Sequence, residues 1–252
     1  MQKKWRIIQT KENTAAYNMA LDEAIATLRA EGKVPNTLRF FTWKPSAITI
    51  GYFQSRDREV DLEKAKSHGI DVVRRYTGGG AVLHEDEITY SIVADEKDFP
   101  SDILASYKLI CEGLISALRQ VGITAEFRPI NDIIVNGKKI SGNAQTRKNG
   151  VLLQHGTLLL QVDVKKMFSI LKVPDEKLRD KIIADVSKVV TSVSAELDKN
   201  ISVEEMQEAL IAGFQEVLNF TGKEGEFLPE EIELAQKLHD EKYNTQGWNG
   251  WR

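Results

Sequence analysis

Two arginines followed by three glycines form the segment of this sequence best suited to chemistry. It reads Arg74-Arg75-Tyr76-Thr77-Gly78-Gly79-Gly80-Ala81-Val82-Leu83-His84. The glycines leave backbone N–H groups uncovered by side chains, so a phosphate or carboxylate can approach closely, and the guanidinium groups add fixed positive charge. No Gly-Lys-Ser/Thr follows, which excludes a Walker A loop, and no helix-forming run follows, which excludes a dinucleotide fingerprint. The segment predicts an anion-binding loop, although a plain glycine-rich turn between strands would have the same composition.

A lysine pair beside a tight turn is the second chemical feature. Asn136-Gly137 is a strong signal for a two-residue hairpin turn, which would pair Val135 with Lys138, Ile134 with Lys139, Ile133 with Ile140 and Asp132 with Ser141. This register places Lys139 diagonally next to Asp132 on one face and leaves Lys138 at the turn, free to reach solvent. It favours Lys139 as the functional lysine, against the ordinary alternative of a solvent-facing side chain.

The remaining reactive residue types favour structural roles. His84 and His155 are interpreted first as hydrogen-bonding residues, and no two of the 4 histidines have metal-site spacing. Cys111 lies on an apolar helical stripe with Tyr107, Leu114 and Leu118, which predicts a buried thiol rather than a nucleophile. The segment from Met19 to Glu23 is interpreted as a packed helix.

Composition limits the function classes. A net charge of −3 provides no overall basic field for nucleic acid, and a single cysteine excludes an internal disulfide and fits a reducing cytoplasm. We find no signal peptide and no membrane-spanning stretch, so we expect a cytoplasmic protein without a membrane partner.

The order of elements predicts an α+β (mixed α/β) fold. Strands are expected at 37–43, 47–51, 70–75, 88–94, 132–141 and 151–162, and helices near 14–28, 60–67, 101–121, 203–218 and 229–243. This order predicts a mixed, mainly antiparallel sheet flanked by helices. No repeat or Pro/Gly/Ser-rich linker divides the chain, so residues 1–252 are expected to form a single domain.

Taken together, these motifs resemble the lipoate–protein ligase family over nearly the whole chain. Besides the glycine loop, the resemblance rests on Asn18 to Glu23, Gly51-Tyr52-Phe53-Gln54, Asn131-Asp132, Lys138 to Ala144, His155 to Leu159, Lys242-Tyr243 and Trp248-Asn249. It implies the fold of the biotin/lipoate ligase catalytic domain.

The resemblance implies a two-step reaction with ATP and Mg²⁺, in which lipoate is activated as lipoyl-AMP and transferred to a lysine of a lipoyl carrier domain. The carriers implied are those of 2-oxoacid dehydrogenases and of the glycine cleavage H protein. Lys139 matches the family's essential lysine, and Asp132 would orient the nucleotide or a metal. The other residues expected to line the nucleotide and lipoate pocket are Arg75, Gly78, Gly79, Gly80, Ala81, Val82, Leu83, His84, Gly142 and Ala144.

Two other functions remain open. The nearer alternative is an acyltransferase of the same superfamily, which moves octanoyl or lipoyl groups through a cysteine thioester. Relatives of that type carry the cysteine in an extra stretch before the lysine hairpin, whereas here Phe127-Arg128-Pro129-Ile130 runs directly into Asn131. On this ground the ATP-dependent ligase is expected. A non-catalytic lipoate-binding module would be expected to have lost Arg75 or Lys139, and both are present.

A separate accessory protein is also expected. Single-chain ligases of the family continue into a further C-terminal domain, whereas here only Gly250-Trp251-Arg252 follows Asn249. The resemblance therefore points to a bipartite ligase with a second small subunit, for which Trp248 and Trp251 are candidate docking residues. The alternative is that this segment packs on its own domain.

Overall fold

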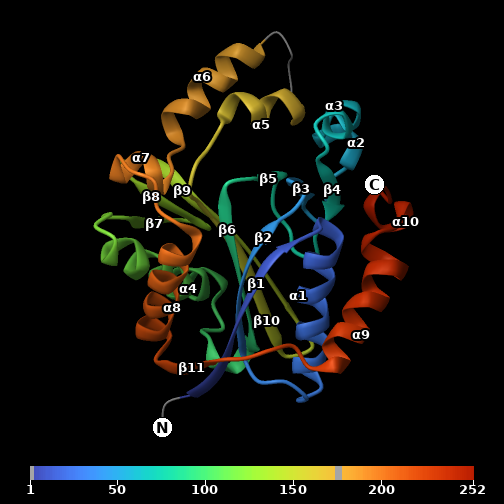
Figure 1. Cartoon of the computed structure of the whole chain (residues 1–252), viewed down its shortest axis with the longest axis vertical. Coiled ribbons are helices and arrows are strands. Elements are labelled where there is room, and N and C mark those ends of the chain that lie inside the picture. The colour runs from blue at the N-terminus through green and yellow to red at the C-terminus, as the bar shows by residue number, and fades with distance from the viewer. Residues whose placement is uncertain (1–2, 174–177) are drawn as a thin grey trace.

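A large mixed sheet forms the centre of the molecule (Figure 1). The computed structural model describes residues 3–173 and 178–252. In sheet order, the eight strands are β11 (Phe220–Glu224), β1 (Lys3–Asn13), β2 (Thr37–Trp43), β6 (Glu87–Asp95), β10 (Val151–Leu159), β9 (Lys138–Lys148), β8 (Asp132–Val135) and β7 (Glu126–Arg128). Strand β1 pairs in parallel with β11 and β2, and the other neighbours are antiparallel. The expected mixed, mainly antiparallel sheet is confirmed.

Helices cover both faces of this sheet (Figure 1). Helices α4 (Ile103–Gln120) and α8 (Val203–Leu218) pack together over one face. Their close approach needs glycine, because a side chain on Gly213 would collide with the backbone of Gly113. Helices α1 (Ala15–Ala30) and α9 (Pro229–Leu238) cover the other face. Among the described residues, no helix combines the length and apolar character that crossing a membrane requires.

A second, three-stranded sheet carries the glycine loop. Its strands in order are β4 (Asp71–Arg74), β3 (Ala47–Ile50) and β5 (Val82–His84). Apolar residues of this sheet pack against those of short helices, with Ile48, Ile50, Val60 and Ile170 buried together. Because β4 and β5 both pair with β3, the segment 75–81 that joins them is fixed at both ends.

The remaining elements are short or peripheral. They are α2 (Arg56–Glu59), α3 (Leu62–Ser67), η1 (Glu96–Asp98), α5 (Val164–Ile170), α6 (Arg179–Val189), α7 (Val193–Leu197), η3 (His239–Tyr243) and α10 (Gln246–Asn249). The helix expected at 229–243 changes from α to π geometry after Leu238.

The lysine hairpin departs from the expected register. Asn136 and Gly137 both have positive φ, as a two-residue turn of this type requires, and Val135 pairs with Lys138 as expected. Beyond the Ile134–Lys139 pair the register shifts by one residue, so that Ile133 faces Ser141. The expected Ile133–Ile140 and Asp132–Ser141 pairs are therefore wrong. The irregularity lets Ile140 join the core and brings Gly142, rather than Ser141, to the same face as Lys139.

Candidate active site

A cavity of about 160 Å³ lies between the two sheets, where the glycine loop faces the lysine hairpin. Nine of the expected site residues line it: Arg75, Gly79, Gly80, Ala81, Val82, His84, Lys139, Gly142 and Ala144. Three expected residues stand behind its wall. Gly78 accepts hydrogen bonds from Arg75, Leu83 packs in the core of the small sheet, and Asp132 pairs with Lys139. We refer to this space as the main pocket.

Arg75 is the most unusual group in the main pocket. Its guanidinium is buried, yet no described carboxylate forms an ion pair with it. Its nitrogens donate instead to neutral oxygens, among them the carbonyls of Gly78 and Gly80 at 2.6 and 2.9 Å. Burial lowers the pKa of Arg75 to about 10, which still leaves it protonated at neutral pH. A buried and uncompensated positive charge attracts an anion or a carbonyl oxygen that becomes negative during a reaction.

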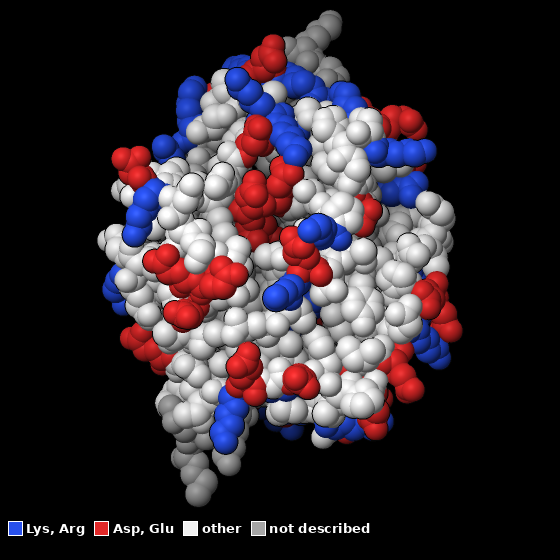
Figure 2. Space-filling model, in the orientation of Figure 1, with Lys and Arg blue, Asp and Glu red and all other residues white. Residues whose placement is uncertain are grey.

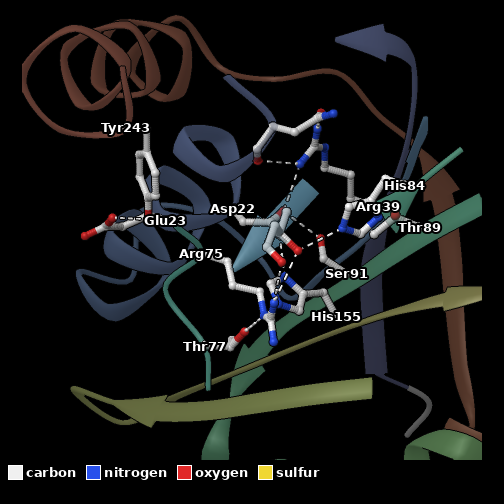
Figure 3. Close-up of polar contacts among 12 residues, drawn as sticks. Asp22, Glu23, Arg39, Arg75, Thr77, His84, Thr89, Ser91, His155 and Tyr243 are labelled. Atoms are coloured by element: carbon white, nitrogen blue, oxygen red, sulfur yellow. Dashed lines mark hydrogen bonds and ion pairs between the residues drawn. The ribbon is translucent and has the colours of Figure 1, made fainter. Parts of the chain in front are cut away.

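Two similar hydrogen-bonded chains hold Arg75 from opposite ends. In the first, Asp22 contacts His155 Nδ1 at 3.2 Å, and His155 Nε2 lies 2.6 Å from Thr77 Oγ1 (Figure 3). In the second, Glu87 lies 3.0 Å from His84 Nδ1, and His84 Nε2 lies 2.9 Å from Thr49 Oγ1.

Both chains end on the guanidinium of Arg75. Its Nε donates to Thr77 Oγ1 and its Nη1 donates to Thr49 Oγ1, each at 3.2 Å. Each chain thus consists of a carboxylate, an imidazole and a hydroxyl, and together they fix the position of Arg75.

The carboxylate of Asp22 belongs to a buried ion pair. Asp22 Oδ1 lies 2.8 Å from Arg39 Nη1 and accepts a hydrogen bond from Ser91. Burial raises the pKa of Asp22, but the hydrogen bond from His155 and the charge of Arg39 outweigh it, so the pKa stays below its ordinary value. Sequence analysis assigned this helix to packing alone. A carboxylate between Leu21 and Ala24, and an arginine in the apolar strand 37–43, were the signals of such a pair.

Close contacts around the glycine loop leave no room for a side chain at Gly51, which faces the loop, or at Gly79 within it. A Cβ on Gly51 would collide with the Gly79 carbonyl, and one on Gly79 would lie 2.7 Å from Arg75 Nη2. Gly79 also has φ of +98°, a conformation that favours glycine. The carbonyls of this loop turn towards Arg75, while the N–H groups of Gly79 and Gly80 find no acceptor among the described residues. These N–H groups remain available to a ligand.

Lys139 faces the loop from the opposite wall. Its Nζ lies 2.6 Å from Asp132 Oδ1, and the other oxygen of Asp132 accepts from Arg128 at 2.9 Å. The proximity of Lys139 to Asp132 that the hairpin predicted is therefore present, while Lys138 is exposed at the turn. Gly142 makes room for Lys139, because a Cβ there would lie 2.8 Å from Nζ.

Residues that sequence analysis did not assign complete the pocket wall. They are Met19, Trp43, Thr49, Thr89, Asn131, Asn143, His155, Gly156 and Thr157. They converge from α1, from separate strands and from the turn at Asn131, so spacing alone did not assign them to the pocket, although six of the nine lie in segments on which the family resemblance rests. Cys111 lies elsewhere, fully buried in α4, where burial raises the pKa of its thiol. This agrees with its predicted structural role.

Comparison with known proteins identifies the family. Residues 14–215 match the model of the lipoyl protein ligase A/B catalytic domain. The chain belongs to this family. It is 38% identical to octanoyltransferase LipM of Kyrpidia tusciae, over 97% of this chain and 98% of the relative, and 37% identical to octanoyltransferase LipM of Brevibacillus brevis over similar shares. Among solved structures, a bipartite lipoate protein ligase from Thermoplasma acidophilum matches 98% of this chain, with a TM-score of 0.89 and 34% identity.

These relatives correct the expected reaction. Several relatives 35–38% identical over nearly the full length carry the name octanoyltransferase, which contradicts the expectation of an ATP-dependent lipoate–protein ligase. The protein is an enzyme of the lipoate ligase and transferase family. The expectation of an ATP-dependent ligase rested on the absence of the cysteine-bearing stretch from this chain. The alignment with the Brevibacillus relative spans 270 positions, more than the 252 residues here, so that relative does have stretches that this chain lacks.

The expected nucleotide and metal have limited support from the site. Among the described residues, no group of three or more His, Cys, Asp or Glu side chains could hold a metal ion. Both carboxylate oxygens of Asp132 are engaged, one by Lys139 and the other by Arg128, and its expected role in orienting the nucleotide or a metal stays a prediction. ATP and Mg²⁺ stay predictions.

The buried His84 should make stability depend on pH. Burial lowers the pKa of His84 although Glu87 favours its charged form. Because the folded-state pKa lies below the unfolded value of about 6.5, the unfolded chain binds the proton more tightly. The free energy of unfolding should therefore fall as pH drops below about 6.5. Urea denaturation at pH 7.5 and 5.5 measures this, and His84→Gln should show a shallower dependence. Equal slopes in both proteins would contradict the assignment.

Two neighbouring glycines should differ in their tolerance of alanine. Gly79→Ala should lower the free energy of unfolding by about 1–3 kcal/mol, because it forces a side chain into a strained conformation and against Arg75. Gly80→Ala is the matched control, since an added Cβ there meets nothing within 4 Å. Chemical denaturation of both variants checks this. Equal stability would mean that the loop is free to rearrange.

Proposed function

We propose that this protein transfers an octanoyl group from a thioester donor directly to a lysine of a lipoyl carrier domain. The relatives named octanoyltransferase support the acyl group, and the family model supports the class of acceptor. The observation that carries the proposal is Arg75, a buried guanidinium without a carboxylate partner in the described structure, at the wall of a pocket that also holds Lys139.

The main pocket fits the demands of acyl transfer. Attack on a thioester puts negative charge on the carbonyl oxygen, and groups already oriented towards that charge lower the barrier. Lys139 and the free N–H groups of the glycine loop supply such groups, and the positive charge of Arg75 acts behind them although its N–H groups already donate to protein oxygens. Met19, Trp43 and Val82 add apolar surface for the acyl chain.

The transfer step needs only the donor and the acceptor. The neutral amine of the acceptor lysine attacks the octanoyl carbonyl carbon, a C–N bond forms, and the C–S bond breaks. The proton lost by the amine passes to the leaving thiolate, so the products are an octanoyl amide and the free donor thiol. The positive charge of Lys139 favours the neutral form of a second amine close to it.

The position of Cys111 supports direct transfer. A covalent route would need an accessible thiolate, and Cys111 is the single cysteine of the chain. Its side chain is fully buried and its pKa is raised, and it is absent from the lining of the main pocket. The acyl group therefore passes from donor to acceptor without resting on the protein.

The experiment mixes the protein with an octanoyl-thioester carrier and an unmodified lipoyl domain, without ATP, and follows the lipoyl domain by mass spectrometry. The octanoyl amide should form, and Cys111→Ser should form it at a rate within about twofold of the unchanged protein. Product that appears only with free octanoate and ATP would refute transfer. An acyl thioester on Cys111 would refute the direct route.

The two lysines of the hairpin should respond differently to alanine. Lys139→Ala should lower kcat by about 10²–10³-fold, the effect of removing one oriented electrostatic group. Lys138→Ala, at an exposed turn position, should stay within about twofold. Steady-state rates of octanoyl transfer measure both. Similar losses in the two variants would remove Lys139 from the site.

The proposal assigns one partner, and the other expectations about partners and location stay predictions. A lipoyl domain is the acceptor, and a separate accessory subunit stays a prediction. Of its two candidate docking residues, Trp248 is half-buried and donates a hydrogen bond to the Arg74 carbonyl at 2.9 Å, while Trp251 is 42% exposed. The expected cytoplasmic location also stays a prediction.

A further inference from the structure

The positive charge of Lys139 reaches the main pocket together with the negative charge of Asp132. Lys139 Nζ lies 2.6 Å from Asp132 Oδ1, and the two side chains are 38% and 19% exposed. The two charges are close and opposite, so Asp132 offsets much of the stabilisation that Lys139 could give to a carbonyl oxygen that becomes negative. Lys139 can act fully on such an oxygen only if the charge of Asp132 is itself balanced.

Arg128 balances this carboxylate. Its Nη2 donates to Asp132 Oδ2 at 2.9 Å, so each oxygen of Asp132 has its own cation. No other carboxylate of the described residues forms an ion pair with Lys139 or Arg128. We call Lys139, Asp132 and Arg128 the charge triad. Two cations and one carboxylate leave the charge triad with an excess of positive charge.

The pairing of three strands fixes the carboxylate at the centre of the charge triad. Asp132 of β8 pairs with Arg128 of β7 on one side and with Gly142 of β9 on the other. Reciprocal hydrogen bonds hold the start of β8 in this position. The Asn131 carbonyl accepts from Asn143 Nδ2 at 2.9 Å, and Asn131 Nδ2 donates to the Asn143 carbonyl at 2.5 Å. The backbone therefore keeps Asp132 within reach of both cations.

Arg128 lies outside the substrate space. It lines neither the main pocket nor the neighbouring cavity that Lys139 also lines, and its side chain is 43% exposed. The protein as a whole offers no positive field in its place, because its net charge is −3 and acidic side chains gather near the middle of the face shown in Figure 2. Any effect of Arg128 on the reacting carbonyl therefore passes through Asp132 and Lys139.

We propose that Arg128 is a positioning residue for octanoyl transfer, which balances the charge of Asp132 and so leaves the charge of Lys139 available to the reacting carbonyl oxygen. The inference rests on the proposed function and adds to it a residue outside the pocket. Without Arg128, the carboxylate would hold Lys139 more strongly and would oppose the negative charge of the transition state. The loss appears in kcat rather than in KM, because that charge develops only during the reaction.

Removal of the Arg128 charge should slow transfer by way of Asp132. In Arg128→Gln, kcat should fall about fivefold with both KM values within about twofold, and Arg128→Lys should recover most of the loss. In a chain that already carries Asp132→Asn, Arg128→Gln should change kcat by less than about twofold, because no carboxylate charge is left to balance. Arg119→Gln is the matched control, since Arg119 is exposed and lines neither cavity.

Binding of two small probes separates a charge effect from a structural one. Octanoate carries the negative charge that the carbonyl oxygen acquires, and octanamide has the same chain without that charge. In calorimetric titrations, Arg128→Gln should bind octanoate about fivefold more weakly than the unchanged protein does, and octanamide within about twofold. Thermal unfolding of each variant checks that the chain is folded at the assay temperature.

The probes also distinguish this inference from the proposed function. If octanoate binding changes as expected but the unchanged protein transfers no octanoyl group, the charge balance at Lys139 stands and the proposed function fails. The inference is overturned if Arg128→Gln leaves kcat or octanoate binding unchanged, weakens both probes equally, or loses the same activity in the chain that carries Asp132→Asn.

Discussion

The buried positive charge of Arg75 is the constraint on which the rest of the site depends. A guanidinium removed from water and left without a carboxylate needs many neutral acceptors in fixed positions. The glycine loop supplies carbonyls by curving around it, and Thr49 and Thr77 supply hydroxyls whose orientation is set by His84 and His155. Enclosing this side chain requires glycine at Gly79, where a Cβ would lie 2.7 Å from Arg75 Nη2, while the glycines together leave N–H groups exposed to a ligand.

The two sheets contribute different residues around this charge. The small sheet carries Arg75 and the glycine loop, whereas the large sheet carries Lys139, His155 and the carboxylate Glu87. Helix α1 adds Asp22, held by Arg39 from the neighbouring strand β2. The pocket is therefore a junction of layers, and its geometry depends on how the layers pack rather than on a single loop.

The sequence predicted those parts of the site that are local. The glycine loop, the Asn136-Gly137 turn and the closeness of Lys139 to Asp132 follow from short-range rules, and the structure contains all three. The one-residue shift after Ile134 was not predictable, because burial of Ile140 in the core decides it. The roles of Asp22, Thr49 and His155 were missed for the same reason, since their partners are distant in the chain. The reaction was predicted wrongly because the missing cysteine bears on the route of the acyl group, covalent or direct, and not on the identity of the acyl donor.

The hydrogen bonds that tie Arg74 of strand β4 to Trp248 and Asn249 have a consequence for the order in which the protein folds during synthesis. The backbone N–H of Arg74 donates to the side chain of Asn249, and the Arg74 guanidinium donates to the Trp248 and Asn249 carbonyls. A ribosome makes Asn249 175 residues after Arg74. Strand β1 likewise pairs with β11, a strand that is made near the end of synthesis. Trp5 of β1 stacks against Phe220 of β11. A nascent chain therefore carries every residue of the main pocket before the partners of β4 and β1 have been made, and until then the β1 edge of the large sheet is unpaired and open to chaperones or to other chains.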